Sequence, residues 1–312
     1  ATLRLDYTQI RDQDLSLLKN LDELEFLHLN HTGITGEGCQ DLLALPELNA
    51  ISLEYSKLTD AGLRVLSKIE PLRLLYVTNT DITNEGMQTI GEMKNLTKLK
   101  ITGNPQLNDT GIAHLANLSK LEYLFAYQNP GITDAGLQHL QGLDSLHEIS
   151  LSTTGITDEG LKDLAGLKKL GKLEIVNCKI TDEGLKHLYR AKTLQNLDLR
   201  QTKVTPEGVA TLKRALPKCK IESDFEASML DRSPKTEREI AEWIIGLGGS
   251  VAVNGMSCKQ VANLPDEMFE ITAVALRESE FEDDQLASLA NLKKLTGLYL
   301  DSSSISDTAL TH

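Results

Sequence analysis

The four cysteines are the most reactive side chains in this sequence, and their spacing points to a structural role. Cys39, Cys178, Cys219 and Cys258 form no Cys-x-x-Cys pair and have no histidine paired with them, so the spacing predicts neither a zinc site nor a disulfide framework. Cys39 stands where other repeats of the chain carry leucine, and Cys178 where they carry threonine. We therefore expect buried, reduced thiols, which favours a reducing compartment such as the cytoplasm.

A column of acidic or amide residues recurs along the chain, mostly after threonine: Asp12, Asp60, Asn84, Asp109, Asp134, Asp158 and Asp182. Such a column could bind calcium, but calcium-binding repeats carry denser acidic and glycine-rich signatures. Each of these residues precedes a short helical pattern, where a side-chain oxygen can accept hydrogen bonds from the first N–H groups of the helix. We therefore predict N-caps, and no metal or other cofactor.

Histidines and a glycine-rich segment offer two further kinds of site. His114, His139 and His187 occupy equivalent helical positions, but no Cys, Asp or Glu completes a zinc ligand set at their level. The glycine-rich residues 246–250 come directly after a helical pattern, whereas a phosphate-binding loop comes after a strand and precedes a helix. We therefore expect these residues to end the helix and not to bind phosphate. The sequence also contains no Gly-x-Ser-x-Gly, His-Glu-x-x-His or P-loop motif. We expect no catalytic residues and no enzyme activity.

A hydrophobic pattern with a period of 24 residues, twice stretched to 25, carries most of these residues. Within one repeat, Leu27 and Leu29 alternate with outward positions as in a strand, and Cys39, Leu42 and Leu45 then follow at the spacing of one helix face. The aliphatic residue of the phrase Thr-x-Ile-Thr-Asp marks nine such repeats: Ile10, Ile34, Leu58, Ile82, Leu107, Ile132, Ile156, Ile180 and Val204.

Units of this length are too small to bury their own apolar face and must stack on their neighbours. Each repeat is expected to supply one strand and one helix. The predicted fold class is α/β, a right-handed solenoid with a parallel β-sheet on its concave face and helices on its convex face. Adjacent parallel strands lie about 4.8 Å apart, so nine of them would line roughly 40 Å of the concave face.

The pattern LxxLxLxxTxITDxGLxxLxxL, clearest over 146–167 and 170–188, resembles the leucine-rich repeats. The match is closest to the ribonuclease-inhibitor-like or cysteine-containing class, in a 24-residue variant of bacterial type, and it covers about residues 1–222 and 271–312. The resemblance implies partner binding on the concave face and implies no chemistry. The chain lacks the F-box-like helices, catalytic cysteine domain and Gly-x-Ile-Pro turns of other members.

The repeat pattern breaks once and then restarts. Residues 1–222 read as an array of about nine repeats without an N-terminal cap, followed by a polar linker over 223–232. Residues 233–270 are expected to cap a second array, of which 271–312 are the first, truncated units. We therefore expect the chain to be a segment of a longer protein with several modules.

Local signals and an internal alignment support this division. A helix to about Leu247, a strand over Ser250–Val253 and a turn at Asn254–Gly255 are expected in the cap. A shift of the first array by 271 residues places its apolar positions, without a gap, on those of the second: Leu276, Phe281, Leu286, Leu289, Leu292, Leu295, Leu298, Leu300 and Ile305.

The composition narrows the range of partners. A net charge of -13 and a pI near 5.1 argue against nucleic acid or anionic membrane as a general partner, because both require clustered lysine and arginine. The sequence has no apolar run of the roughly 18 to 20 residues that a membrane span needs. Localisation stays open, and self-association through the ends of the array is the alternative use of such a surface.

Outward strand positions are the ones that folding does not explain, and several of them are aromatic or basic. Exposed aromatic residues on a rigid sheet are typical of binding hot spots. We expect a non-catalytic scaffold that binds a protein or peptide there. The alternatives are a self-associating spacer and the substrate-recognition adaptor of a modification enzyme. The predicted partner-binding residues are Phe26, His28, Tyr55, Tyr76, Lys98, Lys100, Tyr123, Phe125 and Tyr127.

Overall fold

The computed structural model describes residues 1–225, 236–246, 248–265, 267–277, 289 and 292–301. The chain divides into two compact units, Ala1–Glu226 and Ala227–His312, which we call the N-terminal and C-terminal units. None of the described helices is long and apolar enough to cross a membrane.

Within residues 1–225, ten strands of three residues form one parallel sheet in chain order. The register is uniform, with Phe26 opposite Ala50 and Ala50 opposite Leu74, so equivalent residues of successive repeats form straight columns. The last strand follows the ninth repeat and adds one strand to the nine expected. The strands are β1 (Thr2–Arg4), β2 (Phe26–His28), β3 (Ala50–Ser52), β4 (Leu74–Tyr76), β5 (Lys98–Lys100), β6 (Tyr123–Phe125), β7 (Glu148–Ser150), β8 (Lys172–Glu174), β9 (Asn196–Asp198) and β10 (Lys220–Glu222).

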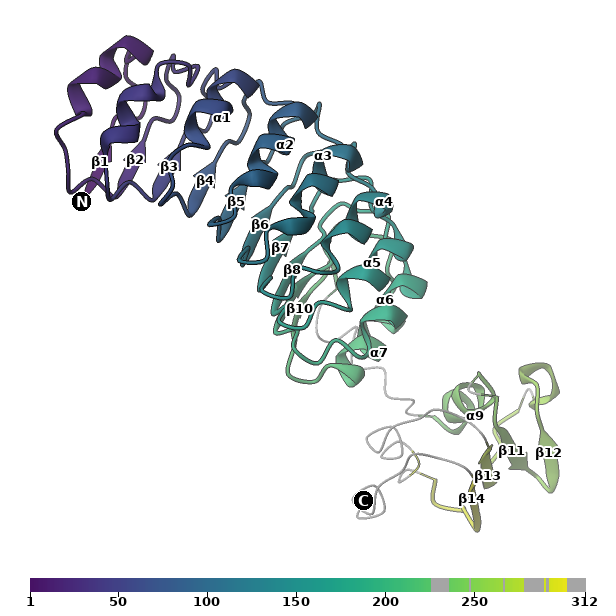
Figure 1. The fold of residues 1–312 in the computed structure, drawn as a ribbon. Helices are drawn as coiled ribbons and strands as arrows, with labels where there is room; N and C mark the ends of the chain where they lie inside the picture. Colours follow the sequence, from purple (N-terminus) through teal and green to yellow (C-terminus); the bar gives the residue numbers. More distant parts are fainter. Residues whose placement is uncertain (226–235, 247, 266, 278–288, 290–291, 302–312) are drawn as a thin grey trace. The chain divides into compact units, whose positions relative to one another are not determined.

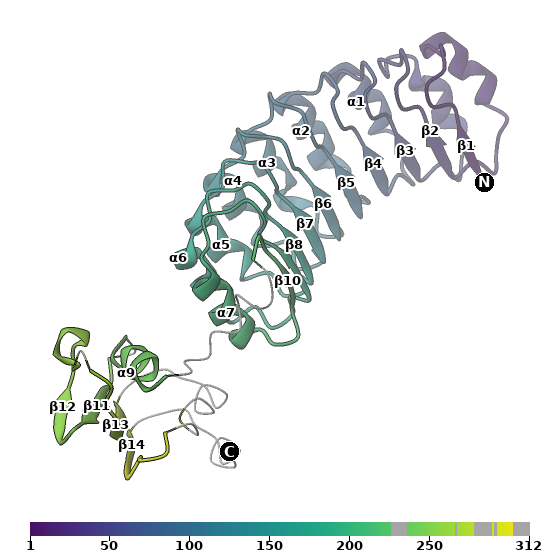
Figure 2. The ribbon, with the colours of Figure 1, turned by 180° about the vertical axis from the view of Figure 1, so that it is seen from behind.

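Short helices follow the strands and lie on the other side of the unit. The N-terminal unit is an arc, with the strands along its inner side and the helices along its outer side (Figures 1 and 2). This is the α/β solenoid that the repeat predicts. The helices are η1 (Asp12–Leu18), η2 (Cys39–Ala44), α1 (Asp60–Leu66), α2 (Asn84–Glu92), α3 (Asp109–Ala113), η3 (His114–Asn117), α4 (Asp134–Leu137), η4 (Gln138–Leu140), α5 (Asp158–Leu164), α6 (Asp182–Leu188) and α7 (Pro206–Ala215).

The first two repeats carry 3-10 helices, and their sequences show why. Most later helices begin after a threonine whose hydroxyl accepts a backbone N–H, as Thr181 does from Glu183; Asn108 takes this role before α3. In the first repeat Arg11 replaces that threonine, and in the second Gly36, with a φ of 90°, replaces the aspartate that follows it. Without these residues the helix has a weaker start, and η2 begins only at Cys39.

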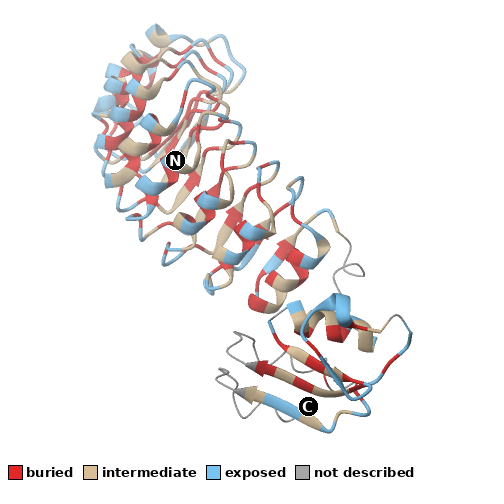
Figure 3. Cartoon of the chain, turned by 90° about the vertical axis from the view of Figure 1, so that its right-hand side faces the viewer, coloured by how far each residue is buried: buried red, intermediate tan, exposed pale blue. Residues whose placement is uncertain are grey.

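The core lies between the sheet and the helices. The middle residue of each strand points into it, as Leu27 and Ile51 do, and aliphatic residues of the helices meet them there. Figure 3 shows this pattern as buried positions on both layers. All four cysteines are free and buried, and burial raises the pKa of the Cys219 thiol to about 11.

The recurring aspartates join neighbouring repeats, which corrects their predicted role as N-caps. Asp134 Oδ1 accepts the backbone N–H of Thr157 at 2.8 Å, and Oδ2 accepts the Thr157 hydroxyl at 2.5 Å. In most of these repeats the threonine hydroxyl also caps its own helix, as Thr133 does by accepting the N–H of Ala135, and the aspartate of the preceding repeat binds that threonine. The same contact joins Asp12 to Thr35, Asp60 to Thr83, Asp109 to Thr133, Asp158 to Thr181 and Asp182 to Thr205.

The glycine of the Thr-Asp-x-Gly phrase belongs to the same contact. A Cβ atom on Gly136 would lie 2.6 Å from Oδ1 of Asp109, which is closer than real Cβ contacts. Only glycine therefore lets the aspartate of the preceding repeat reach its threonine. The recurring phrase thus joins one repeat to the next through three residues: the aspartate of one repeat and the threonine and glycine of the following one.

The two 25-residue repeats use asparagine where the others use threonine, serine or cysteine. The buried Asn104 side chain donates to the carbonyls of Val77 and Ile101, both at 2.9 Å, and its backbone N–H donates to Asn129 Oδ1 at 2.8 Å. The pairing of Lys98 with Tyr123 continues the common register, so β5 and β6 pair without a bulge. The extra residue lies in the turn.

In the C-terminal unit, the described residues form one α-helix, one short 3-10 helix and four strands of one sheet. Its elements are α9 (Glu237–Gly246), β11 (Ser250–Val253), β12 (Met256–Cys258), η5 (Val261–Asn263), β13 (Ile271–Arg277) and β14 (Gly297–Asp301), with the strand order β12-β11-β13-β14. β11 is antiparallel to β12 and β13, whereas β13 and β14 are parallel. Ile240, Ile244, Val251 and Val274 belong to its core.

Several local predictions for this unit are confirmed. The strand over Ser250–Val253 is present, and Asn254 and Gly255 form the turn after it with φ values of 51° and 80°. The expected positions of Phe281, Leu286 and Ile305, and most of the expected linker over 223–232, lie outside the described residues.

Candidate protein-binding surface

The inner side of the arc presents three columns of side chains, which we call the concave wall. They are the first and third residues of each strand β1–β10 and the residue two positions after each strand. Of the predicted binding residues, Phe26, His28, Tyr76, Lys98, Lys100, Tyr123, Phe125 and Tyr127 belong to the wall. His28 is buried and the other seven are half-buried. These side chains therefore pack against one another and do not project freely into solvent.

Aromatic residues of β2 and β4 meet across β3. The Phe26 ring stacks on His28 at 3.8 Å and contacts Tyr76 edge-on at 6.1 Å between ring centroids. The strand between them carries small residues, Ala50 and Ser52, which are only 2% and 1% exposed although they face outward. The large side chains therefore close over the small ones and form a continuous surface.

Lys98 extends this surface to β6. Its ammonium lies 5.2 Å from the ring centroid of Tyr123, 5.3 Å from that of Phe125 and 5.8 Å from that of Tyr76. The cation thus stands among three rings that belong to two different strands. The Tyr123 ring also stacks on His147, with the centroids 6.5 Å apart.

Lys100 plays a different part from Lys98. Its ammonium contacts Oε1 of Glu54 at 2.7 Å, and Glu54 also accepts the Thr78 hydroxyl at 2.6 Å. Burial lowers the pKa of Lys100, but the hydrogen bond and charge of Glu54 outweigh it, so the pKa is raised. Lys100 is therefore a charged, already paired member of the wall.

Burial also shifts the pKa values of two aromatic members. Burial, with the nearby Arg4 charge, lowers the pKa of His28 below its ordinary value of 6.5, so the imidazole is neutral at pH 7. Burial, with the charge of Glu54, raises the pKa of Tyr76, so its phenol keeps its proton. The wall between β2 and β6 therefore offers aromatic faces, the phenol donor of Tyr76 and one cation, Lys98, that has no carboxylate partner among the described residues.

Tyr55 lies outside the wall, in the turn after β3. It stacks on His31 at 4.4 Å, and His31 stacks on Tyr7 at 4.3 Å, so these three residues form a column that we call the rim ladder. Tyr7 is 76% exposed and Tyr55 52%. All three have positive φ, between 54° and 60°. The sequence signal was their common position directly before Thr8, Thr32 and Ser56.

Comparison with known proteins shows which families and solved structures share this architecture. A family model described as Leucine Rich repeat matches residues 24–43, 92–116, 144–165 and 166–188. A solved internalin (inlF) from Listeria monocytogenes aligns over 99% of this chain and 83% of its own, with 20% identity and a TM-score of 0.56. The chain is a leucine-rich repeat protein. A second internalin (inlC2) of the same organism aligns over 72% and 80%, with 22% identity and a TM-score of 0.44. No curated protein sequence matches the chain.

The second half of the wall in this leucine-rich repeat protein is ionic. On β7 and β8, Lys172 contacts Glu148 at 2.7 Å and Glu174 at 2.8 Å. On β9 and β10, Arg200 contacts Asp198 at 2.5 Å, and Lys220 contacts Glu222 at 2.6 Å. These charges satisfy one another within the wall, whereas the first half has aromatic rings at the same positions.

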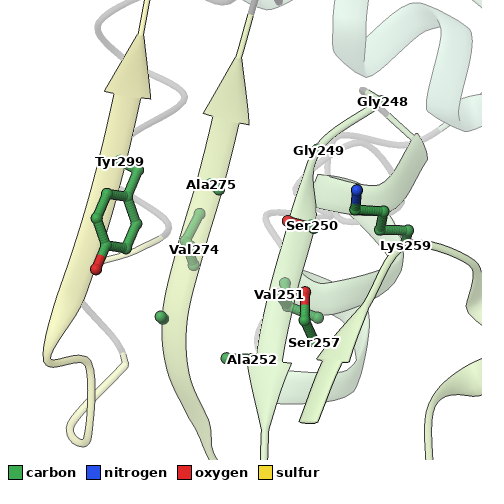
Figure 4. A pocket seen from close by; sticks show the side chains of 11 residues that line it. Gly248, Gly249, Ser250, Val251, Ala252, Ser257, Lys259, Val274, Ala275 and Tyr299 are labelled. Atoms are coloured by element: carbon green, nitrogen blue, oxygen red, sulfur yellow. The ribbon is translucent and has the colours of Figure 1, made fainter.

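The C-terminal unit of the leucine-rich repeat protein has a shallow trough on the face of its sheet (Figure 4). Small residues line its floor, including Ala252 on β11 and Ala275 on β13, with Lys259 at one side and Tyr299 at the other. Among the described residues, no group of three or more His, Cys, Asp or Glu side chains could hold a metal ion. The aromatic half of the wall therefore remains the best-developed candidate site.

Proposed function

We propose that the N-terminal unit is an interaction scaffold that binds a protein or peptide on the aromatic half of its concave wall. Solenoid arrays of this kind use their extended concave surface for binding. The proposed contact residues are those of the wall between β2 and β6, with Tyr55 on the adjoining rim.

One observation carries the proposal. The columns of the wall run through ten strands with the same backbone and register, yet aromatic side chains gather on β2, β4 and β6. A preference of strands for aromatic residues would act equally on β7–β10, where ion pairs stand instead. The difference between the two halves is therefore a property of the surface and not of the fold.

The packing of this surface also suits binding. Half-buried rings lose little rotamer freedom when a partner covers them, because their neighbours already fix them. Tyrosine and phenylalanine supply a large contact area, and the Tyr76 hydroxyl can donate a hydrogen bond. A rigid patch of this kind resembles the buried centre of a protein interface, and the polar residues of the wall around it would form the solvent-exposed border of that interface.

The experiment is capture of a partner from a lysate of the source organism by the whole chain. The double substitution Tyr123→Ala and Phe125→Ala is expected to reduce capture at least tenfold, since alanine replaces two central anchors. Asn196→Ala is the matched control, because Asn196 stands on β9 in the same column as Tyr123. Equal capture by all three proteins would contradict the proposal.

We further propose that residues 233–270 cap a second array that starts at β13. β13 and β14 pair in parallel in the same register as β1 and β2 do, once the first array is shifted by 271 residues. The pair Leu3–Leu27, for example, then falls on Val274–Leu298. The antiparallel strand β11 covers the other edge of β13. The trough of Figure 4 would then be the first part of a second concave wall.

A further inference from the structure

The inference concerns the partner of the concave wall and rests on the proposed function. It starts from the charges of the wall. From β2 to β10, Lys100, Lys172, Arg200 and Lys220 each contact a carboxylate. Among the described residues, no carboxylate forms an ion pair with Lys98. Lys98 is thus the one lysine or arginine in this part of the wall that has no carboxylate partner among the residues that the structure describes.

The rings around Lys98 position its ammonium without neutralising it. A cation–π contact attracts the ammonium to the rings and leaves its full charge in place. With three rings between 5.2 and 5.8 Å away, the ammonium is held at the centre of the aromatic surface and not extended into solvent. A partner that covered these rings would bury the charge, which is costly unless the partner supplies an anion.

We propose that Lys98 binds the carboxylate of an aspartate or glutamate in the partner, beside an apolar side chain packed on Tyr76 and Phe125. A single charge fits better than a phosphate, because Lys100 is already engaged by Glu54 and the Glu54 carboxylate would repel a dianion. The whole chain has a net charge of -13 and would repel acidic partners in general. The charge of Lys98 is therefore the feature that would select an acidic side chain at this place.

The test uses a displayed library of random 12-residue peptides, selected on the whole chain. Selected peptides are expected to share an acidic residue next to an aromatic or aliphatic one. Lys98→Met, which keeps the length of the side chain, should weaken them at least tenfold, and Lys98→Arg should restore most of the affinity. Lys172→Met is the matched control, because Lys172 already has two carboxylate partners and stands in the same column.

A double-mutant cycle then measures the coupling between Lys98 and the acidic residue of the peptide. Replacing the acidic residue of the peptide with its amide should weaken binding to the wild-type chain about tenfold and binding to Lys98→Met very little. Thermal unfolding of Lys98→Met at the wild-type temperature shows that the fold is intact.

Two results overturn the inference, and they are distinguishable. If the peptides need Tyr123 and Phe125 but bind Lys98→Met as well as wild type, the acidic contact is wrong and the proposed function stands. If every selected peptide binds the Tyr123→Ala, Phe125→Ala variant unchanged, the proposed function fails, and this inference fails with it.

Discussion

A residue in the left-handed region recurs in the turn after the strands. Besides the rim ladder, Asn79, Gln128, Thr153, Asn177 and Gln201 have φ between 49° and 58°. Asparagine tolerates this region, whereas a β-branched side chain is strained in it. The turn itself could be predicted from the recurring threonine, but its left-handed residue could not, because tyrosine, glutamine and threonine are poor candidates for that conformation.

Thr153→Asn is expected to stabilise the N-terminal unit. The change removes the β-branched strain at a φ of 57° on an exposed side chain and should contribute about 0.5–1 kcal/mol, or about 1–3 °C in Tm. Differential scanning calorimetry measures it. Asn177→Thr, the reverse change at the same position of the next repeat, should lower the Tm. A lower Tm for Thr153→Asn would refute the role given to strain.

At the scale of the element, strands and helices could be predicted because each is signalled by local periodicity. Leu27 and Leu29 mark a strand and Leu42 a helix within one repeat, and the structure confirms both kinds of element. The role of the aspartates was missed because the partner of each lies 23 or 24 residues away in the next repeat. A local pattern shows which residues can cap a helix, and stacking decides which of them does so.

Asp134→Ala is expected to destabilise the N-terminal unit by about 2 kcal/mol. The change leaves the Thr157 N–H without its carboxylate acceptor at a half-buried junction between repeats. Urea unfolding followed by circular dichroism measures the loss. Asp144→Ala is the control, because its ion pair with Lys168 is exposed on both sides and should contribute about 0.5 kcal/mol or less. Equal effects of the two variants would contradict the account of the aspartates.

At the scale of the whole molecule, the break of the repeat after residue 222 and its restart near 271 stay predictions; the structure divides the chain into Ala1–Glu226 and Ala227–His312. The candidate site was predictable in outline, since alternation shows which side chains face the wall. Its internal organisation was not, because the contacts of Lys98 with three rings and of Lys100 with Glu54 depend on side-chain directions across neighbouring strands. Tyr55 likewise belongs to the rim and not to the wall.

Val251→Asp is expected to unfold the C-terminal unit alone. Val251 is fully buried in the separate hydrophobic core of the C-terminal unit. An unpaired carboxylate there should lower the free energy of unfolding of this unit by several kcal/mol. Calorimetry should show one transition lost or lowered and the main transition of the N-terminal unit unchanged. Ser250→Asp, on the opposite face of β11, is the control. A shift of both transitions would show that the units do not have independent cores.

The central claim is that the aromatic half of the wall is the binding surface, and photo-crosslinking tests it most directly. A photoreactive phenylalanine analogue would replace Tyr123 on the wall or, as the control, Tyr189 after α6 on the outer side. We predict one dominant adduct from position 123, lost when Phe125→Ala is added, and no such adduct from position 189. The same adducts from both positions, or none from position 123, would contradict the claim.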